Sequence, residues 1–207
     1  MSGQINRGSK LGELIFNFAS NTDYKVYVEI GTWNGQGSTL CFRQGLETRD
    51  DDWSFFSFES DENFYRQAES FHGKIDAKFN LIYGRIIEPE DMMSLDSPVV
   101  KEHYENHVHE SIHTRFFNHD YGAYGKCTNK LHLLEDLEID VLLLDGGEFS
   151  TYAEFEILKD RAKIIILDDT TELKTKHVHA ALISDSDWDC LLESSERHGY
   201  SMHRRIA

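Results

Sequence analysis

The sequence contains little cysteine and little proline. Its 207 residues include three cysteines, Cys41, Cys127 and Cys190, which are odd in number, far apart and never arranged as CxxC. This usage argues against a disulfide framework and indicates free thiols in a reducing compartment. We therefore expect a cytoplasmic protein. The two prolines, Pro89 and Pro98, both lie in one irregular region.

Positive charge and long apolar runs are also scarce. Lys and Arg number 21 against 37 Asp and Glu, which gives a formal net charge of −16 at pH 7. A chain this acidic repels phosphate backbones, so the composition disfavours nucleic acid and anionic membranes as partners. The first residues carry no apolar signal core, and no apolar run approaches the length that spans a membrane.

The apolar residues that are present suffice for one folded domain. Hydrophobic residues make up 40% of the chain and aromatic residues 12%, which fits a folded globule rather than a disordered chain. A chain of 207 residues is long enough for a sizeable core, so we expect a single α/β domain over 1–207.

A short apolar strand and a glycine-rich turn occupy residues 25–39, KVYVEIGTWNGQGST. The β-rich run at 26–30 predicts a buried parallel strand. Gly31, Gly35 and Gly37 follow it, and a helical pattern begins at about Ser38. Strand, glycine turn and helix is a layout that lets the backbone approach a nucleotide-like ligand at a helix N-terminus.

The rest of the chain alternates between strand-like and helix-like segments. Strands are predicted at 53–58, 77–83, 138–144 and 163–167, and the final pair at 188–193 and 200–205 has the pattern of a hairpin. Helices are predicted after Ser9, at 38–46, from 60 onward, at 152–162 and at 177–184. The alternation predicts a doubly wound, mostly parallel seven-stranded sheet with an antiparallel C-terminal hairpin. Ligands of such sheets lie beyond the carboxyl ends of the strands.

The segment 88–134 interrupts this alternation. It is polar, contains both prolines, shows no convincing apolar stripe, and has five histidines between 103 and 119. We interpret it as a lid-like insertion over the strand ends.

One acidic residue, Glu59, ends the second predicted strand. It lies about 20 residues beyond the glycine turn, where a carboxylate can accept both ribose hydroxyls of a nucleotide. The alternative is a carboxylate that only caps the following helix beside Ser60. Similar turns also serve NAD and FAD, so the turn alone does not identify the cofactor.

Three further carboxylates end the fourth and fifth predicted strands: Asp145, Asp168 and Asp169. Adjacent parallel strands lie about 4.8 Å apart, so the three side chains can converge, and they would repel one another. A hard divalent cation such as Mg²⁺ would resolve this repulsion. The alternative is that Asp168 and Asp169 cap the next helix while Asp145 contacts the cofactor. We expect the residues that follow, Lys174, Lys176, His177 and His179, to form a solvated helix start; the alternative is that they guide an acceptor.

A competing motif lies in the insertion. His109, Glu110 and His113 match HExxH, and His119 stands where some zinc peptidases place a third ligand. Phe116 replaces the glycine that such a site needs. We therefore favour a solvated lid over a zinc peptidase or a structural metal site.

The glycine turn resembles a known family. EIGTWNGQGS is similar to motif I of class I S-adenosylmethionine-dependent methyltransferases, in the form found in small O-methyltransferases. The resemblance covers roughly 26–170 and implies the Rossmann-like methyltransferase fold. It implies that the following residues lie at the cofactor: Glu29, Gly31, Thr32, Gly35, Ser38, Glu59, Ser60, Gly84, Arg85 and Asp145.

The aspartates extend the resemblance. DGG followed by ILDDT is similar to metal-dependent O-methyltransferases that modify macrolide sugars (the macrocin and mycinamicin type) and to related cephalosporin-modifying enzymes. Those families often carry His after the DGG, where this chain has Glu148. The resemblance implies Asp145 and Asp168 as catalytic residues and Asp145, Asp168 and Asp169 as ligands of Mg²⁺ or another divalent cation.

The function expected from these patterns is O-methylation of a small sugar- or polyol-like acceptor, with two neighbouring hydroxyls bound to the metal. Asp145 or a histidine of the insertion would take the proton. Two other classes stay open: an NAD(P)-type oxidoreductase on the same sheet, and a cofactor-binding protein without turnover. The sequence also leaves a homo-oligomer open.

Overall fold

The structure, a computed structural model, describes residues 5–73, 77–105 and 111–206. Within these ranges the strands form one sheet of seven, in the order β3-β2-β1-β4-β5-β7-β6. Their bounds are β1 Val26–Ile30, β2 Ser54–Glu59, β3 Phe79–Tyr83, β4 Ile139–Leu144, β5 Ala162–Asp168, β6 Trp188–Ser194 and β7 Tyr200–Arg205. The strands β1 to β5 pair in parallel, whereas β7 pairs antiparallel with both β5 and β6. This confirms the predicted sheet and its C-terminal hairpin.

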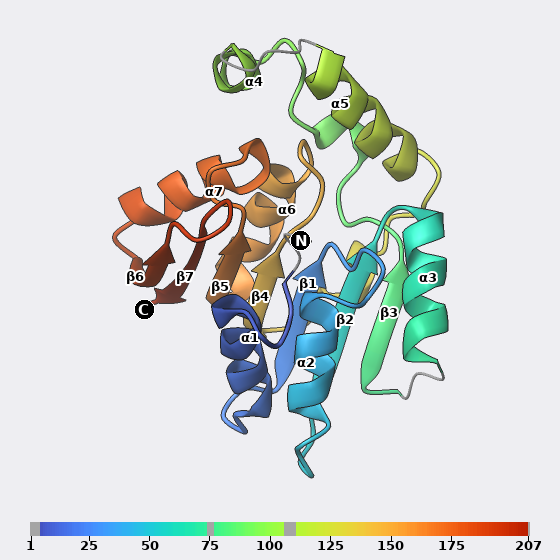
Figure 1. The fold of residues 1–207 in the computed structure, drawn as a ribbon, viewed down its shortest axis with the longest axis vertical. Helices are drawn as coiled ribbons and strands as arrows, with labels where there is room; N and C mark the ends of the chain where they lie inside the picture. Colours follow the sequence, from blue (N-terminus) through green and yellow to red (C-terminus); the bar gives the residue numbers. More distant parts are fainter. Residues whose placement is uncertain (1–4, 74–76, 106–110, 207) are drawn as a thin grey trace.

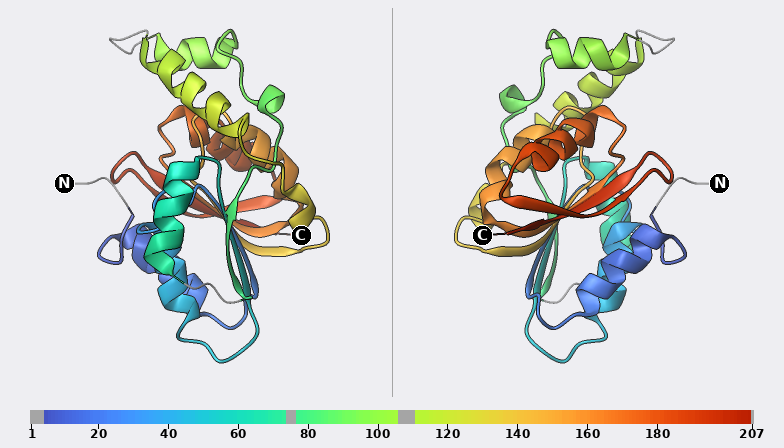
Figure 2. Two further views of the ribbon diagram at one scale, coloured as in Figure 1. Left: turned by 90° about the vertical axis from the view of Figure 1, so that its right-hand side faces the viewer. Right: turned by 90° about the vertical axis from the view of Figure 1, so that its left-hand side faces the viewer.

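Helices cover both faces of the sheet (Figures 1 and 2). The helices α1 (Lys10–Ser20), α2 (Ser38–Leu46) and α3 (Glu62–His72) lie on one face, and α6 (Thr151–Leu158) and α7 (Leu173–Ser184) lie on the other. The predicted N-cap Ser9 accepts a hydrogen bond from the Gly12 amide at 3.1 Å, and Asp61 caps α3 in the same way. Such caps satisfy amide groups that have no partner within the helix.

The central strands are buried on both faces because alternate side chains enter two separate cores. Val28 and Leu142 pack toward α6 and α7, whereas their neighbours Tyr27 and Val141 pack toward α1 and α2. All four side chains are fully buried. Apolar residues on both faces explain why β1 and β4, apart from Glu29 and Asp140, are apolar in sequence rather than alternating.

In the segment between β3 and β4, the helices α4 (Pro98–Tyr104) and α5 (Ser111–Tyr124) lie beyond the carboxyl ends of the strands, and the chain then returns to the amino end of β4 (Figure 1). The segment also contains η1 (Pro89–Asp91) and η2 (Leu131–Leu133). The expectation that it lacks a core stripe is wrong, because Val100, Tyr124 and Leu134 are buried in the core of the α6–α7 face. The segment is therefore built into the domain at its base, and its action as a lid stays a prediction.

The predicted start of α7 is also wrong. The helix begins at Leu173 rather than at 177, and its N-cap is Glu172. The Glu148 side chain, from the loop after β4, accepts the hydrogen bond of the Leu173 amide at 3.1 Å. This long-range cap satisfies the first turn and lets the helix start one turn earlier. The helix α6 ends at Leu158, and the short η3 (Lys159–Arg161) completes the predicted stretch.

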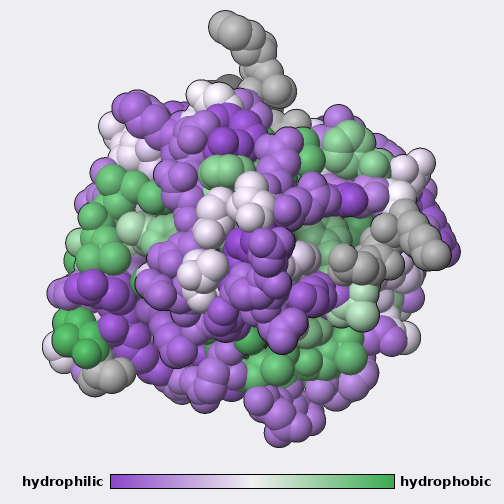
Figure 3. Space-filling model, turned by 90° about the horizontal axis from the view of Figure 1, so that it is seen from below, coloured by the Kyte–Doolittle hydropathy of each residue, from purple (hydrophilic) through white to green (hydrophobic). Residues whose placement is uncertain are grey.

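The end of the molecule opposite the insertion is mainly hydrophilic (Figure 3). Apolar residues on this face form several separate areas among polar ones. A homo-oligomer stays a prediction. Among the described residues, no helix combines the length and the apolar character needed to cross a membrane.

Candidate active site

A cavity of about 420 Å³ opens at the carboxyl ends of the parallel strands, where the strand-end turns meet α5. Ten residues proposed from the sequence line it, and they come from turns that are far apart in the chain. They are Gly31, Thr32, Ser38, Glu59, Ser60, Gly84, Arg85, Asp145, Asp168 and Asp169. Glu29 and Gly35, the other two proposed residues, do not line the cavity.

The turn after β1 requires glycine at its first position. Gly31 has a φ of +99°, and a Cβ atom placed there would lie 2.1 Å from the backbone oxygen of Asp145. Both the left-handed conformation and the close approach exclude a side chain. The Gly31 and Thr32 amides donate to the Phe58 carbonyl at 3.0 and 3.2 Å, so the turn is fastened to the end of β2. Gly35 instead packs against α3, where its carbonyl oxygen lies 2.8 Å from His72 Nε2.

Glu29 lies beneath this turn and is fully buried. Its Oε2 accepts hydrogen bonds from Thr39 Oγ1 at 2.7 Å and from Ser57 Oγ at 2.5 Å, whereas Oε1 has no hydrogen-bond partner. Burial raises the pKa of Glu29 to about 7. Glu29 therefore ties β1, β2 and α2 together under the cavity rather than forming its wall.

Glu59 faces the cavity from the end of β2 and shapes the turn beside it. Its Oε2 accepts from the Trp33 amide at 2.7 Å, and its Oε1 accepts from the Asp61 amide at 2.8 Å. Burial raises the pKa of Glu59 to about 7. Each carboxylate oxygen has a second lone pair, so Glu59 can accept further hydrogen bonds from a ligand. Asp61, not Glu59, caps α3, so the helix-capping alternative is wrong.

Arg85 has a structural role that the sequence did not indicate. Its guanidinium group donates to the carbonyl oxygens of Tyr124 at 2.9 Å and Ile87 at 3.0 Å, and it also donates to Cys127 O and to Glu88. These bonds fasten both ends of the insertion to the end of β3. Gly84 and Arg85 still line the cavity, but the guanidinium is already engaged.

The three aspartates converge as predicted. One carboxylate oxygen each of Asp145, Asp168 and Asp169 lies within 4.8 Å of the others. Burial, followed by the charges of Asp145 and Asp169, raises the pKa of Asp168 to about 7. The buried Oδ1 atoms of Asp168 and Asp169 have no hydrogen-bond partner. The N-cap of α7 is Glu172, so the alternative that Asp168 and Asp169 cap this helix is wrong.

Two cations, Lys174 and Arg197, offset the aspartates, and no sequence pattern paired either of them with these carboxylates. Lys174 pairs with Asp145 and lies 2.8 Å from Asp169 Oδ2, and Arg197 Nη2 lies 2.9 Å from Asp168 Oδ2. The expectation of a solvated Lys174 is wrong, because only 13% of its side chain is exposed. The charges of Asp145 and Asp169 outweigh its burial and raise the pKa of Lys174. Lys174 faces inward because α7 starts early and places it on the buried side of the first turn.

Asp120 of α5 and Glu154 of α6 form a second acidic group in the cavity wall. Tyr124 donates to Glu154 and to Ser150 Oγ, the latter at 2.9 Å, and Asp120 Oδ2 accepts from the Phe149 amide at 3.3 Å. Burial raises the pKa of Glu154 to about 7 and also raises the pKa of Asp120. No sequence motif marks these residues, since they come together only when the insertion folds onto α6.

The proposed peptidase motif is not assembled among the described residues. His109 and Glu110 lie outside them. The ring of His113 lies 5.1 Å from that of Tyr104, whereas His119 lies 3.6 Å from Asp61 and 3.5 Å from Asp120. Six positions along an α-helix correspond to about 9 Å and to different faces, so His113 and His119 do not converge.

Comparison with solved structures identifies the fold. Similar chains include an SAH-bound methyltransferase of Podospora anserina (TM-score 0.60, 16% identity, covering 95% of this chain and 78% of the other) and an O-methyltransferase of Bacillus cereus in complex with SAH (0.59, 14%, 99% and 84%). A methyltransferase of Geobacter sulfurreducens is also similar (0.58, 13%, 99% and 82%). No family model matches the chain, and no curated protein does. The likeness shows that the chain has the Rossmann-like methyltransferase fold.

Proposed function

We propose that the protein is a methyltransferase that uses S-adenosylmethionine. The observation that carries this proposal is the cavity at the carboxyl ends of the strands, bounded by the Gly31 turn, Glu59 and the aspartate cluster. The neighbours of this fold include structures with SAH bound. In this chain, Glu59 would accept hydrogen bonds from the ribose, and the turn after β1 would hold the methionine part.

The charge of the cavity favours this cofactor over NAD(P). Seven carboxylates line the cavity against three Lys and Arg side chains, and Arg85, Lys174 and Arg197 are all engaged in ion pairs. A diphosphate would meet net negative charge there, whereas the positive sulfonium of S-adenosylmethionine would meet a favourable potential. The seven acidic residues are Glu59, Asp61, Asp120, Asp145, Glu154, Asp168 and Asp169.

The acceptor side of the site is the aspartate cluster, and we propose that the reaction is O-methylation of a small hydroxylated molecule. S-adenosylmethionine supplies the methyl group on its sulfonium, where it is open to in-line attack by an oxygen. Lys174 holds Asp145 in place through its ion pair. The unpartnered Oδ1 of Asp168 is the atom that we assign as proton acceptor, and His119, which lines the same cavity, is the alternative. The walls position the acceptor, which contributes much of the rate in such transfers.

The cluster also fits a divalent cation. It offers carboxylate oxygens from three residues within 4.8 Å of one another, two of them with unpartnered buried oxygens. Oxygen ligands of this kind suit Mg²⁺. A cation bound there would lower the pKa of a coordinated hydroxyl. Lys174 already bridges Asp145 and Asp169, so a metal would have to displace its ammonium group.

Titration calorimetry with SAH and with NAD⁺ tests the cofactor, and methyl transfer from labelled S-adenosylmethionine to a panel of polyols and sugars tests the reaction. We expect SAH to bind and NAD⁺ not to bind. Asp168→Asn should reduce transfer by at least a hundredfold and leave SAH binding within about twofold, since one catalytic proton acceptor contributes roughly 10²–10⁴-fold. Asp189→Asn, an exposed position on β6, is the matched control.

Three results would contradict parts of this proposal. NAD⁺ binding without SAH binding would replace the methyltransferase by an oxidoreductase. SAH binding with no transfer to any acceptor would favour a binding protein. Full methyl transfer in the presence of EDTA would contradict the role of a metal ion but not the methyltransferase activity.

A further inference from the structure

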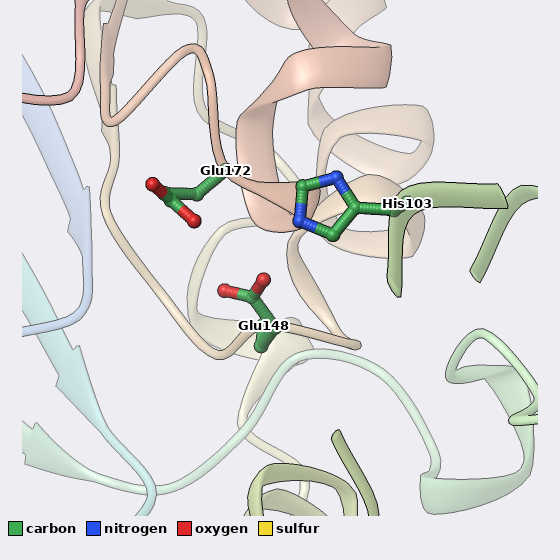
Figure 4. Close-up of side chains that lie close together, drawn as sticks. All are labelled: His103, Glu148 and Glu172. Atoms are coloured by element: carbon green, nitrogen blue, oxygen red, sulfur yellow. The ribbon is translucent and has the colours of Figure 1, made fainter. Parts of the chain in front are cut away.

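A second group of metal-ligating side chains lies outside the aspartate cluster. His103, Glu148 and Glu172 each offer one ligand atom, and these atoms lie within 4.8 Å of one another. Figure 4 shows the three side chains converging from separate segments: α4, the loop after β4 and the residue before α7. All three are partly buried. The sequence separates them by up to 69 positions, so only the fold assembles the group.

The hydrogen bonds of the two glutamates leave an oxygen on each for a further ligand. Glu148 Oε1 accepts from Tyr104 Oη and from the Leu173 amide, both at 3.1 Å. Glu172 Oε1 lies 2.8 Å from His198 Nδ1. In both residues Oε2 has no hydrogen bond from another described residue. The N-cap Glu172 also makes no side-chain bond to its own helix, so its carboxylate is not needed as a cap.

The carboxylates of Glu148 and Glu172 lie close together here, and the His198 imidazole lies beside Glu172. Burial raises the pKa of Glu148, and the nearby Glu172 carboxylate raises it further. Lys174 opposes this shift but is paired with Asp145 and Asp169 in the adjacent cluster. Two carboxylates that face each other in a partly buried position are stabilised by a cation between them.

We propose that His103, Glu148 and Glu172 bind a divalent transition metal, Zn²⁺ in the first place, which fastens α4 to the strand ends. One imidazole and two carboxylates are a ligand set that suits Zn²⁺, and three protein ligands leave a fourth position for water. The imidazole distinguishes this site from the all-oxygen aspartate cluster, because nitrogen ligands favour Zn²⁺ and Co²⁺ over Mg²⁺. The metal would join the insertion to both loops that carry the aspartates.

Co²⁺ binding in excess Mg²⁺ tests the site, because Mg²⁺ occupies oxygen-only sites and Co²⁺ reports nitrogen ligation by its visible absorption. We expect the wild type to bind Co²⁺ with the intense bands of a four-coordinate ion, and Zn²⁺ to displace it. His103→Ala should weaken Co²⁺ binding at least tenfold, whereas His132→Ala, an exposed histidine of the same insertion, should leave it unchanged. Zn²⁺ should raise the melting temperature of the wild type and not that of His103→Ala.

Asp169→Asn separates the two sites. Loss of Co²⁺ absorption in Asp169→Asn with retention in His103→Ala would overturn the proposal and place the cation in the aspartate cluster. Equal Co²⁺ binding in His103→Ala and wild type would also overturn it. If His103→Ala does not fold, Glu172→Gln, which keeps the size of the side chain, must show the same loss. These readouts do not involve methyl transfer, so they stand or fall apart from the proposed activity.

Discussion

Replacing Lys174 by Met tests whether this lysine occupies the place of a metal ion. Asp145, Asp168 and Asp169 carry three negative charges, which Lys174 and Arg197 reduce to one if all five groups are ionised. Methionine is similar in length to lysine but carries no charge, so the net charge of the cluster becomes more negative, from −1 to −2. Lys176→Met, on the exposed side of the same turn, is the matched control.

The expected loss of stability follows from burial. Lys174 is 13% exposed, and its partners Asp145 and Asp169 are 22% and 19% exposed, so the pairs are largely shielded from water. Removing one partner of such a buried pair costs about 3–5 kcal/mol, because the remaining charges stay buried. In EDTA, the free energy of unfolding should fall by this amount in Lys174→Met and by less than about 0.5 kcal/mol in Lys176→Met.

A divalent cation should reverse much of this loss. At 100 times its dissociation constant, a bound ligand stabilises the folded state by about 2.7 kcal/mol. We also expect Mg²⁺ to bind Lys174→Met at least tenfold more tightly than wild type, because it no longer displaces an ammonium group. Urea unfolding with EDTA or Mg²⁺ measures the first effect and titration calorimetry the second. If Mg²⁺ neither rescues nor binds the variant more tightly, the cluster is an ion-pair network and not a metal site.

Three further predictions address the turn, the buried acids and the thiols. Gly31→Ala should destabilise the fold by more than about 1 kcal/mol and abolish SAH binding, because its Cβ would meet Asp145 O at 2.1 Å, whereas Gly122→Ala, with no atom within 4 Å, should not destabilise it in urea unfolding. Glu154 has its pKa raised from 4.5 to about 7, so the folded state binds more protons and the free energy of unfolding falls as pH rises from about 4.5 to 7. Glu154→Gln should flatten this fall in urea titrations at several pH values. In native alkylation followed by mass spectrometry, only Cys190 of the three cysteines should react, because the other two are buried.

The backbone of the sheet and the positions of the aspartates could be predicted because both depend on local pattern. Apolar runs such as 141–144 identify buried strands, and the carboxyl ends of parallel strands lie at one edge of the sheet. Asp145 and Asp168 could therefore be placed together from their positions at strand ends alone. Placing these two aspartates required no knowledge of side-chain contacts.

The partners of these residues could not be predicted, because they depend on contacts between distant segments. Lys174 faces inward only because Glu148, from another loop, caps α7 and moves its start. Arg197 reaches Asp168 from the β6–β7 hairpin, 29 positions away. The insertion contributes Asp120 and Tyr124 to the cavity only after its base has packed onto the core. Its histidine-rich stretch matched a zinc motif by spacing, yet the structure groups its His103 with two glutamates.

The aspartate cluster and the His103, Glu148 and Glu172 group draw carboxylates from the same two loops. The loop after β4 carries Asp145 and, three positions on, Glu148; the loop after β5 carries Asp169 and, three positions on, Glu172. Each loop thus gives one carboxylate to the cavity and one to the group that faces α4. A cation held by Glu148 and Glu172 would fix the spacing of both loops, and with it the separation of Asp145 and Asp169. Occupation of the second site should therefore change metal affinity at the first, and the coupling free energy must be the same in either direction.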